Sequence, residues 1–182
     1  MKPVARVAVL ALVSLSGIAL SSCANSLVMV TMPRTTTHGA PAHRFAASFP
    51  HVPVTTVYND SGTKQPQYGV GVNTRRTYVS GGSGPPTVDV FVDSLTNHVP
   101  DRRQQPFLRS YLPTSHGGRI IKWHGLLAAI AYVPGCDPSG QCVGIIGSLV
   151  VLDGTSLYNI FTHQSNLFSA KAEINTFRLI HK

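Results

Sequence analysis

Four consecutive residues near the start of the chain, Leu20-Ser21-Ser22-Cys23, have the types and order of a bacterial lipobox. In a lipoprotein precursor, a leucine and two small residues precede a cysteine that is acylated and becomes the new N-terminus. Lys2 and Arg6 supply a positive region, and Val7 to Leu20 supplies an apolar region that is too short to span a bilayer comfortably. The alternatives are an ordinary secretory signal or a buried helix that ends in cysteine. We therefore expect a signal peptide over residues 1–22 and lipid attachment at Cys23, which predicts a membrane anchor on the extracytoplasmic side.

The other two cysteines, Cys136 and Cys142, enclose a short sequence that favours a tight turn. Asp137, Pro138 and Gly140 suit the first, second and fourth positions of a type I turn, which brings the two sulfur atoms close. An exported domain meets an oxidising compartment, so we expect a Cys136–Cys142 disulfide. Their spacing does not fit the Cys-x-x-Cys of a redox-active pair, and the loop offers too few ligands for a zinc site.

Basic residues outnumber acidic ones, with 15 Lys and Arg against 7 Asp and Glu and a formal net charge of +8. Loss of residues 1–22 would remove Lys2 and Arg6 and leave +6. Such a charge favours contact with anionic lipid head groups, an anionic envelope polymer or another envelope protein. The candidate anion-contact residues are the two doubled sites, Arg75-Arg76 and Arg102-Arg103, with a solvated basic surface as the alternative. The export signal argues against nucleic acid as a partner, as does the lack of a basic stripe interleaved with aromatic residues.

Three motifs of well-known catalytic sites are absent from the sequence. It has no Gly-x-Ser-x-Gly, no His-Glu-x-x-His and no phosphate loop, and Gly81–Gly84 is better interpreted as a surface loop. The only glutamate, Glu173, is expected on the surface of a helix. Candidate partners for a hydrolytic site are residues that would have to converge in the fold, namely Ser115, Ser148, His116, His124, Asp89, Asp93, Asp101, Asp137 and Asp153. We expect no catalytic residues and no cofactor.

Histidines near the N-terminus do not make a convincing metal site. His38, His43 and His51 are close in sequence, but no carboxylate or cysteine completes a ligand set there. We expect no bound metal. The single tryptophan, Trp123, adjoins Lys122 and His124 and is expected to anchor the core rather than to form a binding surface.

Composition divides the chain into three parts. After the signal peptide, residues 23–44 are expected to form a lipidated N-terminus and a flexible tether, because prolines, glycine and a threonine run break any regular pattern. Leu27–Val30 is apolar, which leaves open whether it lies in the membrane interface or adds an edge strand. Residues 45–182 are long enough for a single domain with its own core.

Hydrophobic periodicity predicts an α+β domain over residues 45–182. The expected helices are 100–112, with a start or kink at Pro106, and 169–177, which is capped by Ser169 and packs Ala170, Ile174 and Phe177 across a sheet. The short links after residue 124 predict an antiparallel meander flanked by helices. The expected strands are 45–49, 68–72, 88–92, 119–124, 126–133, 143–152 and 156–163.

The order of these features resembles the Mog1/PsbP-like fold, above all the actinobacterial and mycobacterial cell-envelope lipoproteins built on it. The residues that carry the resemblance are Phe45-x-x-x-Phe49-Pro50-x-x-Pro53, Gly118-Arg119 through His124-Gly125-Leu126, Leu157-Tyr158, and Ser169 to Phe177. The resemblance covers most of residues 45–182 and implies a layered α+β sandwich. It also implies a binding or accessory role, without identifying a partner.

Together these observations predict a non-enzymatic binding or accessory lipoprotein at the outer face of a membrane. The alternative is a carrier that holds a lipid or glycolipid in an apolar cavity, motivated by the many aliphatic residues between Ile120 and Ile160. An enzyme built around His116 or His124 is a third hypothesis.

Overall fold

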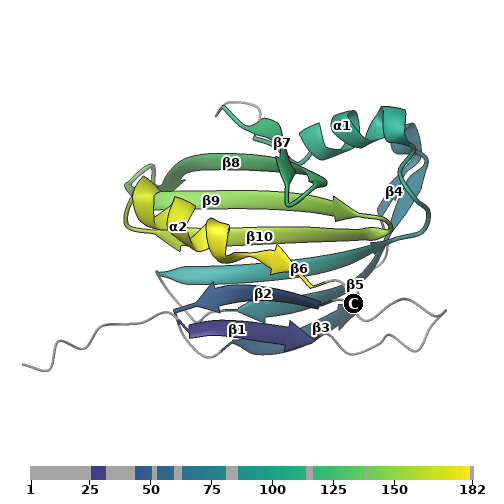
Figure 1. Ribbon diagram of the computed structural model, residues 1–182. Coiled ribbons are helices and arrows are strands. Elements are labelled where there is room, and N and C mark those ends of the chain that lie inside the picture. The colour runs from purple at the N-terminus through teal and green to yellow at the C-terminus, as the bar shows by residue number, and fades with distance from the viewer. Residues whose placement is uncertain are drawn as a thin grey trace, which may run out of the picture.

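The computed structural model describes residues 26–31, 44–50, 53–59, 63–80, 86–113, 117–137 and 139–180 (Figure 1). Two α-helices, α1 (Asp101–Arg109) and α2 (Leu167–Thr176), and a 3-10 helix, η1 (Pro66–Tyr68), accompany the strands. The strands are β1 (Ser26–Thr31), β2 (Arg44–Phe49), β3 (Val54–Asn59), β4 (Thr63–Gln65), β5 (Val70–Ser80), β6 (Thr87–Leu95), β7 (Arg119–Trp123), β8 (Leu126–Cys136), β9 (Cys142–Asp153), β10 (Ser156–Gln164) and β11 (Arg178–Leu179). The chain is therefore α+β, as the sequence predicts.

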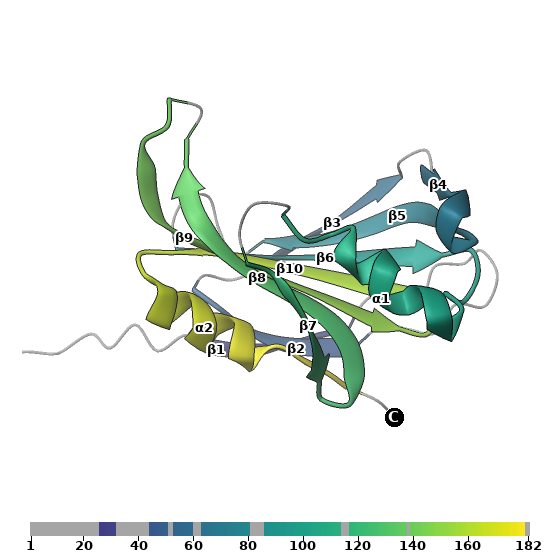
Figure 2. The ribbon, with the colours of Figure 1, turned by 90° about the horizontal axis from the view of Figure 1, so that it is seen from above.

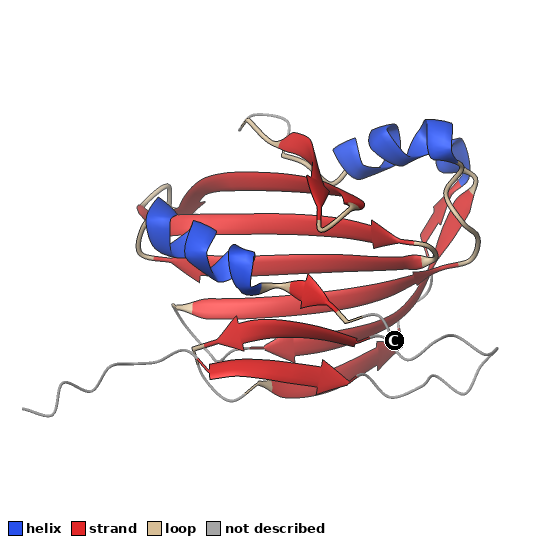
Figure 3. Cartoon of the chain, in the orientation of Figure 1, coloured by secondary structure: helices blue, strands red, loops and turns tan. Residues whose placement is uncertain are grey.

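The larger sheet has the strand order β3-β5-β6-β10-β9-β8-β7, with β4 paired to β5 outside this path (Figure 3). Strands β7 to β10 form an antiparallel meander, which confirms the prediction for the second half of the chain. His124 and Gly125 both have positive φ, at 47° and 89°, between the paired residues Trp123 and Leu126. Two such residues suit the type I′ turn, whose twist matches that of the flanking strands.

A smaller sheet and helix α2 cover one face of the larger sheet. This sheet has the order β1-β2-β11, and Figure 2 shows it beside α2 on the same side of the long strands. Phe45 and Phe177 are fully buried, and their ring centroids lie 5.6 Å apart. They join alternate residues of β6, β8, β9 and β10 in one hydrophobic core, because side chains on a strand point to opposite faces in turn.

Helix α1 packs on the opposite face of the larger sheet. Its Phe107 and Leu108 are fully buried with Leu157 and Val150 in a second core. Pro106 lies inside α1, so the helix begins at Asp101 and continues through the proline rather than beginning there. Burial on both faces explains why β8 to β10 have long apolar runs instead of a strict polar and apolar alternation.

The structure changes several expected boundaries. Helix α2 begins at Leu167, and its N-cap is Asn166, whose Oδ1 accepts a 2.9 Å hydrogen bond from the Ser169 N–H; the Ser169 cap is therefore wrong. Ala170, Ile174 and Phe177 are buried as expected. The strand expected at 68–72 begins at Val70, after η1, and continues to Ser80. Strands β3, β4 and β11 were not predicted.

The N-terminal segment contains a strand where the sequence suggests a tether. Residues 26–31 form β1, which pairs antiparallel with β2 from Ser26 opposite Phe49 to Thr31 opposite Arg44. Of the two alternatives for Leu27–Val30, the edge strand is the one observed. Residues 1–22, Cys23, the remainder of the expected tether and Gly81–Gly84 lie outside the described residues. No helix within the described ranges is long and apolar enough to cross a membrane.

Candidate functional site

A surface groove of about 480 Å³ lies between helix α1 and the edge strand β7. Arg109, Arg119 and Lys122 are among its lining residues, and none of the described residues that line it is acidic. The side chains of Arg109 and Lys122 bring positive charge to the groove, whereas that of Arg119, opposite Ile130, leaves β7 on the other face of the sheet. The remaining lining residues are Gln105, Leu112, Gly118, Ile120, Ile121 and Leu127. The groove thus combines aliphatic residues with positive charge.

Helix α1 positions one wall of this groove. Gln105 and Arg109 are four residues apart and therefore lie on the same side of the helix. The helix is fixed by the buried Phe107, whose ring makes edge contacts with Tyr68 at 5.4 Å and with Tyr111 at 5.4 Å. Arg109 is the last residue of α1, where a cation is stabilised by the negative end of the helix dipole.

Strand β7 and the start of β8 position the other wall. Lys122 lies opposite Leu127, and Ile120 lies opposite Ala129, so these residues share the face on which α1 packs. Trp123 points to the other face, where its Nε1–H donates a 3.3 Å hydrogen bond to the Phe177 carbonyl. Trp123 is half-buried against the first core, which agrees with its predicted role as an anchor.

Gly118, one of the lining residues, packs closely against Leu112 and Ala131. A Cβ at this position would lie 2.8 Å from Leu112 Cδ2 and 3.3 Å from Ala131 Cβ. A larger residue at position 118 would therefore require the Leu112 side chain to move. Arg119, the next residue, lies opposite Ile130 on the face of β7 that carries Trp123, and its charge acts on Tyr132. Burial raises the pKa of Tyr132, and the positive charge of Arg119 opposes that rise.

Of the arginines singled out from the sequence, Arg102 and Arg103 do not line this groove. Arg102 and Arg103 lie in the first turn of α1, and Arg103 Nη1 is 3.5 Å from the position that a Cβ on Gly69 would occupy. Arg75 and Arg76 lie on β5, opposite Asn59 and Tyr58. The cationic side chains in the groove are those of Arg109 and Lys122, which stand alone in the sequence and are not predicted by the doubled basic sites. The only local pattern in the sequence that points to the groove is the four-residue spacing of Gln105 and Arg109, which places both on one side of a helix.

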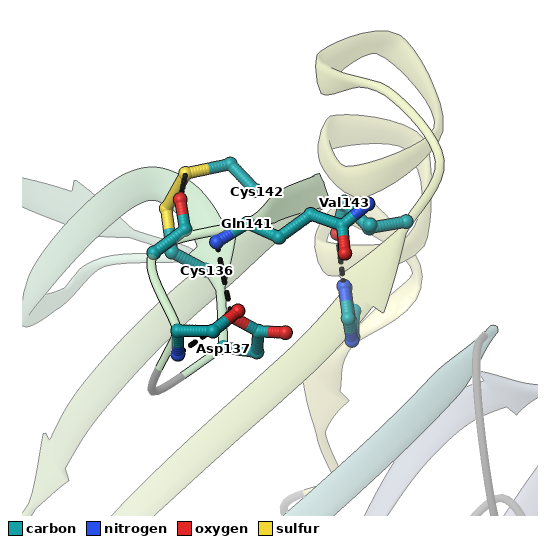
Figure 4. Close-up of a disulfide and its surroundings, with 8 residues drawn as sticks. Cys136, Asp137, Gln141, Cys142 and Val143 are labelled. Atoms are coloured by element: carbon teal, nitrogen blue, oxygen red, sulfur yellow. Dashed lines mark hydrogen bonds between the residues drawn. A yellow bond between two sulfur atoms is a disulfide. The ribbon is translucent and has the colours of Figure 1, made fainter.

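The Cys136–Cys142 disulfide is present and closes the β8–β9 hairpin (Figure 4). Asp137 organises the turn, because its Oδ1 accepts hydrogen bonds from the Ser139 hydroxyl at 2.6 Å, the Ser139 N–H at 2.9 Å and the Gln141 N–H at 3.0 Å. The Ser139 hydroxyl, followed by the Gln141 N–H, lowers the pKa of the Asp137 carboxyl. These contacts give Asp137 a structural role at the tip of the hairpin.

The residues considered for hydrolysis occupy separate parts of the fold. Asp137 and Asp153 lie at opposite ends of β9, while Asp101 begins α1. Asp93 is buried and accepts a 3.2 Å hydrogen bond from the Asn159 amide. His124 serves the β7–β8 turn, Ser148 lies within β9, and Asp89 lies within β6. Ser115, His116, His38, His43 and His51 lie outside the described residues.

Glu173 corrects the expectation of an exposed carboxylate. It is 7% exposed on the inner side of α2, next to the buried Ile174. Glu173 lies three positions after the buried Ala170, so it belongs to the face of α2 that packs on the sheet. In the described ranges, no three His, Cys, Asp or Glu side chains gather in a group that would hold a metal ion.

Comparisons with known proteins leave the chain without an assigned family. No family model, no curated protein and no solved structure matches it.

Proposed function

We propose that this chain is a lipid-anchored binding module of a cell envelope, and that the groove between α1 and β7 is its ligand site. The anchor is Cys23, acylated after removal of residues 1–22, and the domain acts at the outer face of the membrane without catalysis. The proposed fold is the Mog1/PsbP-like sandwich, supported by two helices packed on opposite faces of an antiparallel sheet.

The observation that carries the proposal is the composition of the groove. Two cationic side chains, those of Arg109 and Lys122, line it and none of its described lining residues is acidic, so an anionic group is the chemistry that it favours. Leu112, Ile120 and Leu127 add aliphatic contacts, so the preferred ligand joins its anionic group to an apolar segment. An anionic lipid or polymer of the envelope and an acidic segment of an envelope protein both have that character.

Calorimetric titration with a soluble amphiphilic anion tests this site. The acylated protein, held in phosphatidylcholine nanodiscs, is titrated with hexyl phosphate and separately with hexanol and inorganic phosphate. We expect hexyl phosphate to bind more tightly than either half-ligand. Combining Arg109→Gln with Lys122→Gln weakens binding about fivefold or more, because each exposed charge contributes roughly 0.5–1 kcal/mol.

Arg102→Gln is the matched control, since Arg102 is an exposed cation on the same helix and does not line the groove. Equal losses in the Arg102 variant and in the groove variants would assign binding to general charge and overturn the groove as the site. Binding that lacks saturation in the unsubstituted protein would do the same.

The carrier alternative rests on the aliphatic part of the same groove. A lipid carrier needs a cavity that encloses its ligand, whereas this groove is open along one side. Native mass spectrometry of protein purified from its own host discriminates the two proposals. A stoichiometric co-purified lipid favours the carrier, and a ligand-free mass favours the binding module.

A further inference from the structure

The large apolar side chains that are most exposed gather toward one end of the molecule. Their exposed fractions are 82% for Phe168, 65% for Val54, 61% for Val143, 42% for Leu167 and 37% for Phe161. These five residues are called the apolar end below. They come from β3, β9, β10 and α2, and what they share is the end of the molecule at which they lie.

The strand register places Val54 and Phe161 in one row across the larger sheet. Val54 lies opposite Ser80, Ser80 opposite Asp89, and Asp89 opposite Phe161. The remaining three residues lie just beyond that row. His163, two residues after Phe161, has its Nε2 2.7 Å from the Val143 carbonyl oxygen, and three residues separate His163 from Leu167.

The proposed anchor enters the domain at this same end. Figure 1 shows the start of β1, the start of α2 and the β8–β9 hairpin together on the left, whereas α1 lies on the right. Figure 2 shows the hairpin and the start of α2 again at the end opposite α1. Ser26 begins β1 only three positions after Cys23. Three positions span about 10 Å at most, so acyl chains on Cys23 would hold this end within that distance of the bilayer.

We infer that the apolar end rests on the lipid surface, with Phe168 and Leu167 inserted among the head groups; this rests on the proposed lipid anchor at Cys23. Exposed aromatic and aliphatic side chains are stabilised when they leave water, and the interfacial region accepts such side chains. Lys171 is exposed one turn after Leu167 and lies 6.0 Å from the Tyr132 ring centroid, where its charge meets anionic head groups.

In this orientation one end of the molecule contacts the membrane, and ligand binding takes place elsewhere on the domain. The apolar end faces the bilayer, and α1, which forms one wall of the groove, lies at the opposite end. A ligand in the groove is then presented to the envelope rather than to the lipid that carries the anchor.

Fluorescence quenching by brominated lipid tests the inference. Phe168→Trp and Gln105→Trp each add one exposed helical tryptophan, the first at the apolar end and the second at the rim of the groove. The acylated full-length products are reconstituted into vesicles of phosphatidylglycerol and phosphatidylcholine with brominated acyl chains. The unsubstituted protein supplies the signal of Trp123, which is subtracted from both.

We expect the added emission of the Phe168→Trp protein to shift to shorter wavelength on vesicles and to be quenched when the acyl chains are brominated. The added emission of the Gln105→Trp protein should neither shift nor be quenched. Equal quenching at both positions would overturn the orientation. So would emission at position 168 that shifts without quenching, which indicates contact with a second copy of the chain.

Flotation of the vesicles separates this inference from the proposed function. If the Phe168→Trp protein floats with the vesicles while its added emission stays unquenched, the orientation is contradicted and the anchor is left intact. Protein that does not float contradicts the anchor at Cys23, and the orientation fails with it.

Discussion

The imidazole Nε2 of His163 lies 2.7 Å from the carbonyl oxygen of Val143, and this contact ties β10 to the residue after Cys142. A carbonyl oxygen only accepts, so Nε2 carries the hydrogen and donates it. The ring occupies space next to Gly135, where a Cβ would lie 2.7 Å from the same nitrogen. The disulfide hairpin is therefore fixed to the sheet by a side chain as well as by the backbone register.

Replacing this histidine should loosen the hairpin. His163→Ala removes the donor to the Val143 carbonyl, and we expect the free energy of unfolding to fall by about 1 kcal/mol. Urea denaturation measures the change, with His98→Ala as the control because His98 is exposed. An equal, negligible effect of both substitutions would show that the 2.7 Å contact does not stabilise the fold.

Two glycines with left-handed backbone should respond very differently to alanine. Gly144 has φ +77°, and a Cβ there would collide with the Gln164 carbonyl oxygen, whereas Gly154 has φ +59° and nothing within 4 Å of its Cβ position. We expect Gly154→Ala to cost about 1 kcal/mol from its backbone conformation alone. Gly144→Ala should cost at least about 2 kcal/mol more, because strands β9 and β10 must separate. Similar melting temperatures for the two variants would contradict the close approach.

Loss of the disulfide should weaken the protein without unfolding it. The six-residue separation of Cys136 and Cys142 closes a short loop, and on the chain-entropy model its removal lowers the free energy of unfolding by about 2 kcal/mol. We expect the variant with both cysteines changed to serine to show this loss in urea denaturation. A reductant should produce the same loss in the unsubstituted protein and none in the variant. Unchanged denaturation midpoints would show that the hydrogen bonds of Asp137 suffice to hold the turn.

The Asp137 carboxyl gives the turn a defined pH dependence. Its pKa lies below the ordinary value of 3.8, chiefly because the Ser139 hydroxyl donates to it. A pKa that is lower in the folded state means that the stabilisation is present above 3.8 and is lost as the pH falls through the folded pKa. We expect Ser139→Ala to raise the pKa toward the ordinary value and Ser139→Thr to leave it low, as followed by carbon NMR of the carboxyl. A pKa that is equal in all three proteins would exclude the hydroxyl as the cause.

The meander was predictable from sequence because its strands are apolar and its links carry turn residues. Asp153-Gly154 and Asp137–Gly140 mark two hairpins where local backbone preferences and hydrophobic pattern agree. The start of α2 was harder to predict, because Leu167 and Phe168 are apolar residues left in solvent and the pattern favours a later start. Asn166 decides the boundary through its cap on the Ser169 N–H.

The groove could not be predicted because its two walls come together only in the tertiary structure. Arg109 ends a helix, and Lys122 lies on an edge strand thirteen residues later in the sequence. Neither residue is next to another basic residue in the sequence, so neither belongs to a doubled basic site. For Leu27–Val30 the sequence left an edge strand and the membrane interface as alternatives, because the partner strand β2 lies beyond a stretch rich in threonine, proline and glycine.

The proposed lipid anchor depends most directly on the chemical state of Cys23, which the intact mass of the protein extracted from its host's membranes reveals. We predict a chain that lacks residues 1–22, begins at Cys23 with the added mass of acyl chains, and keeps Cys136 and Cys142 oxidised. A chain that retains Met1, or one that is cleaved without acyl mass at Cys23, would contradict the lipid-anchored binding module.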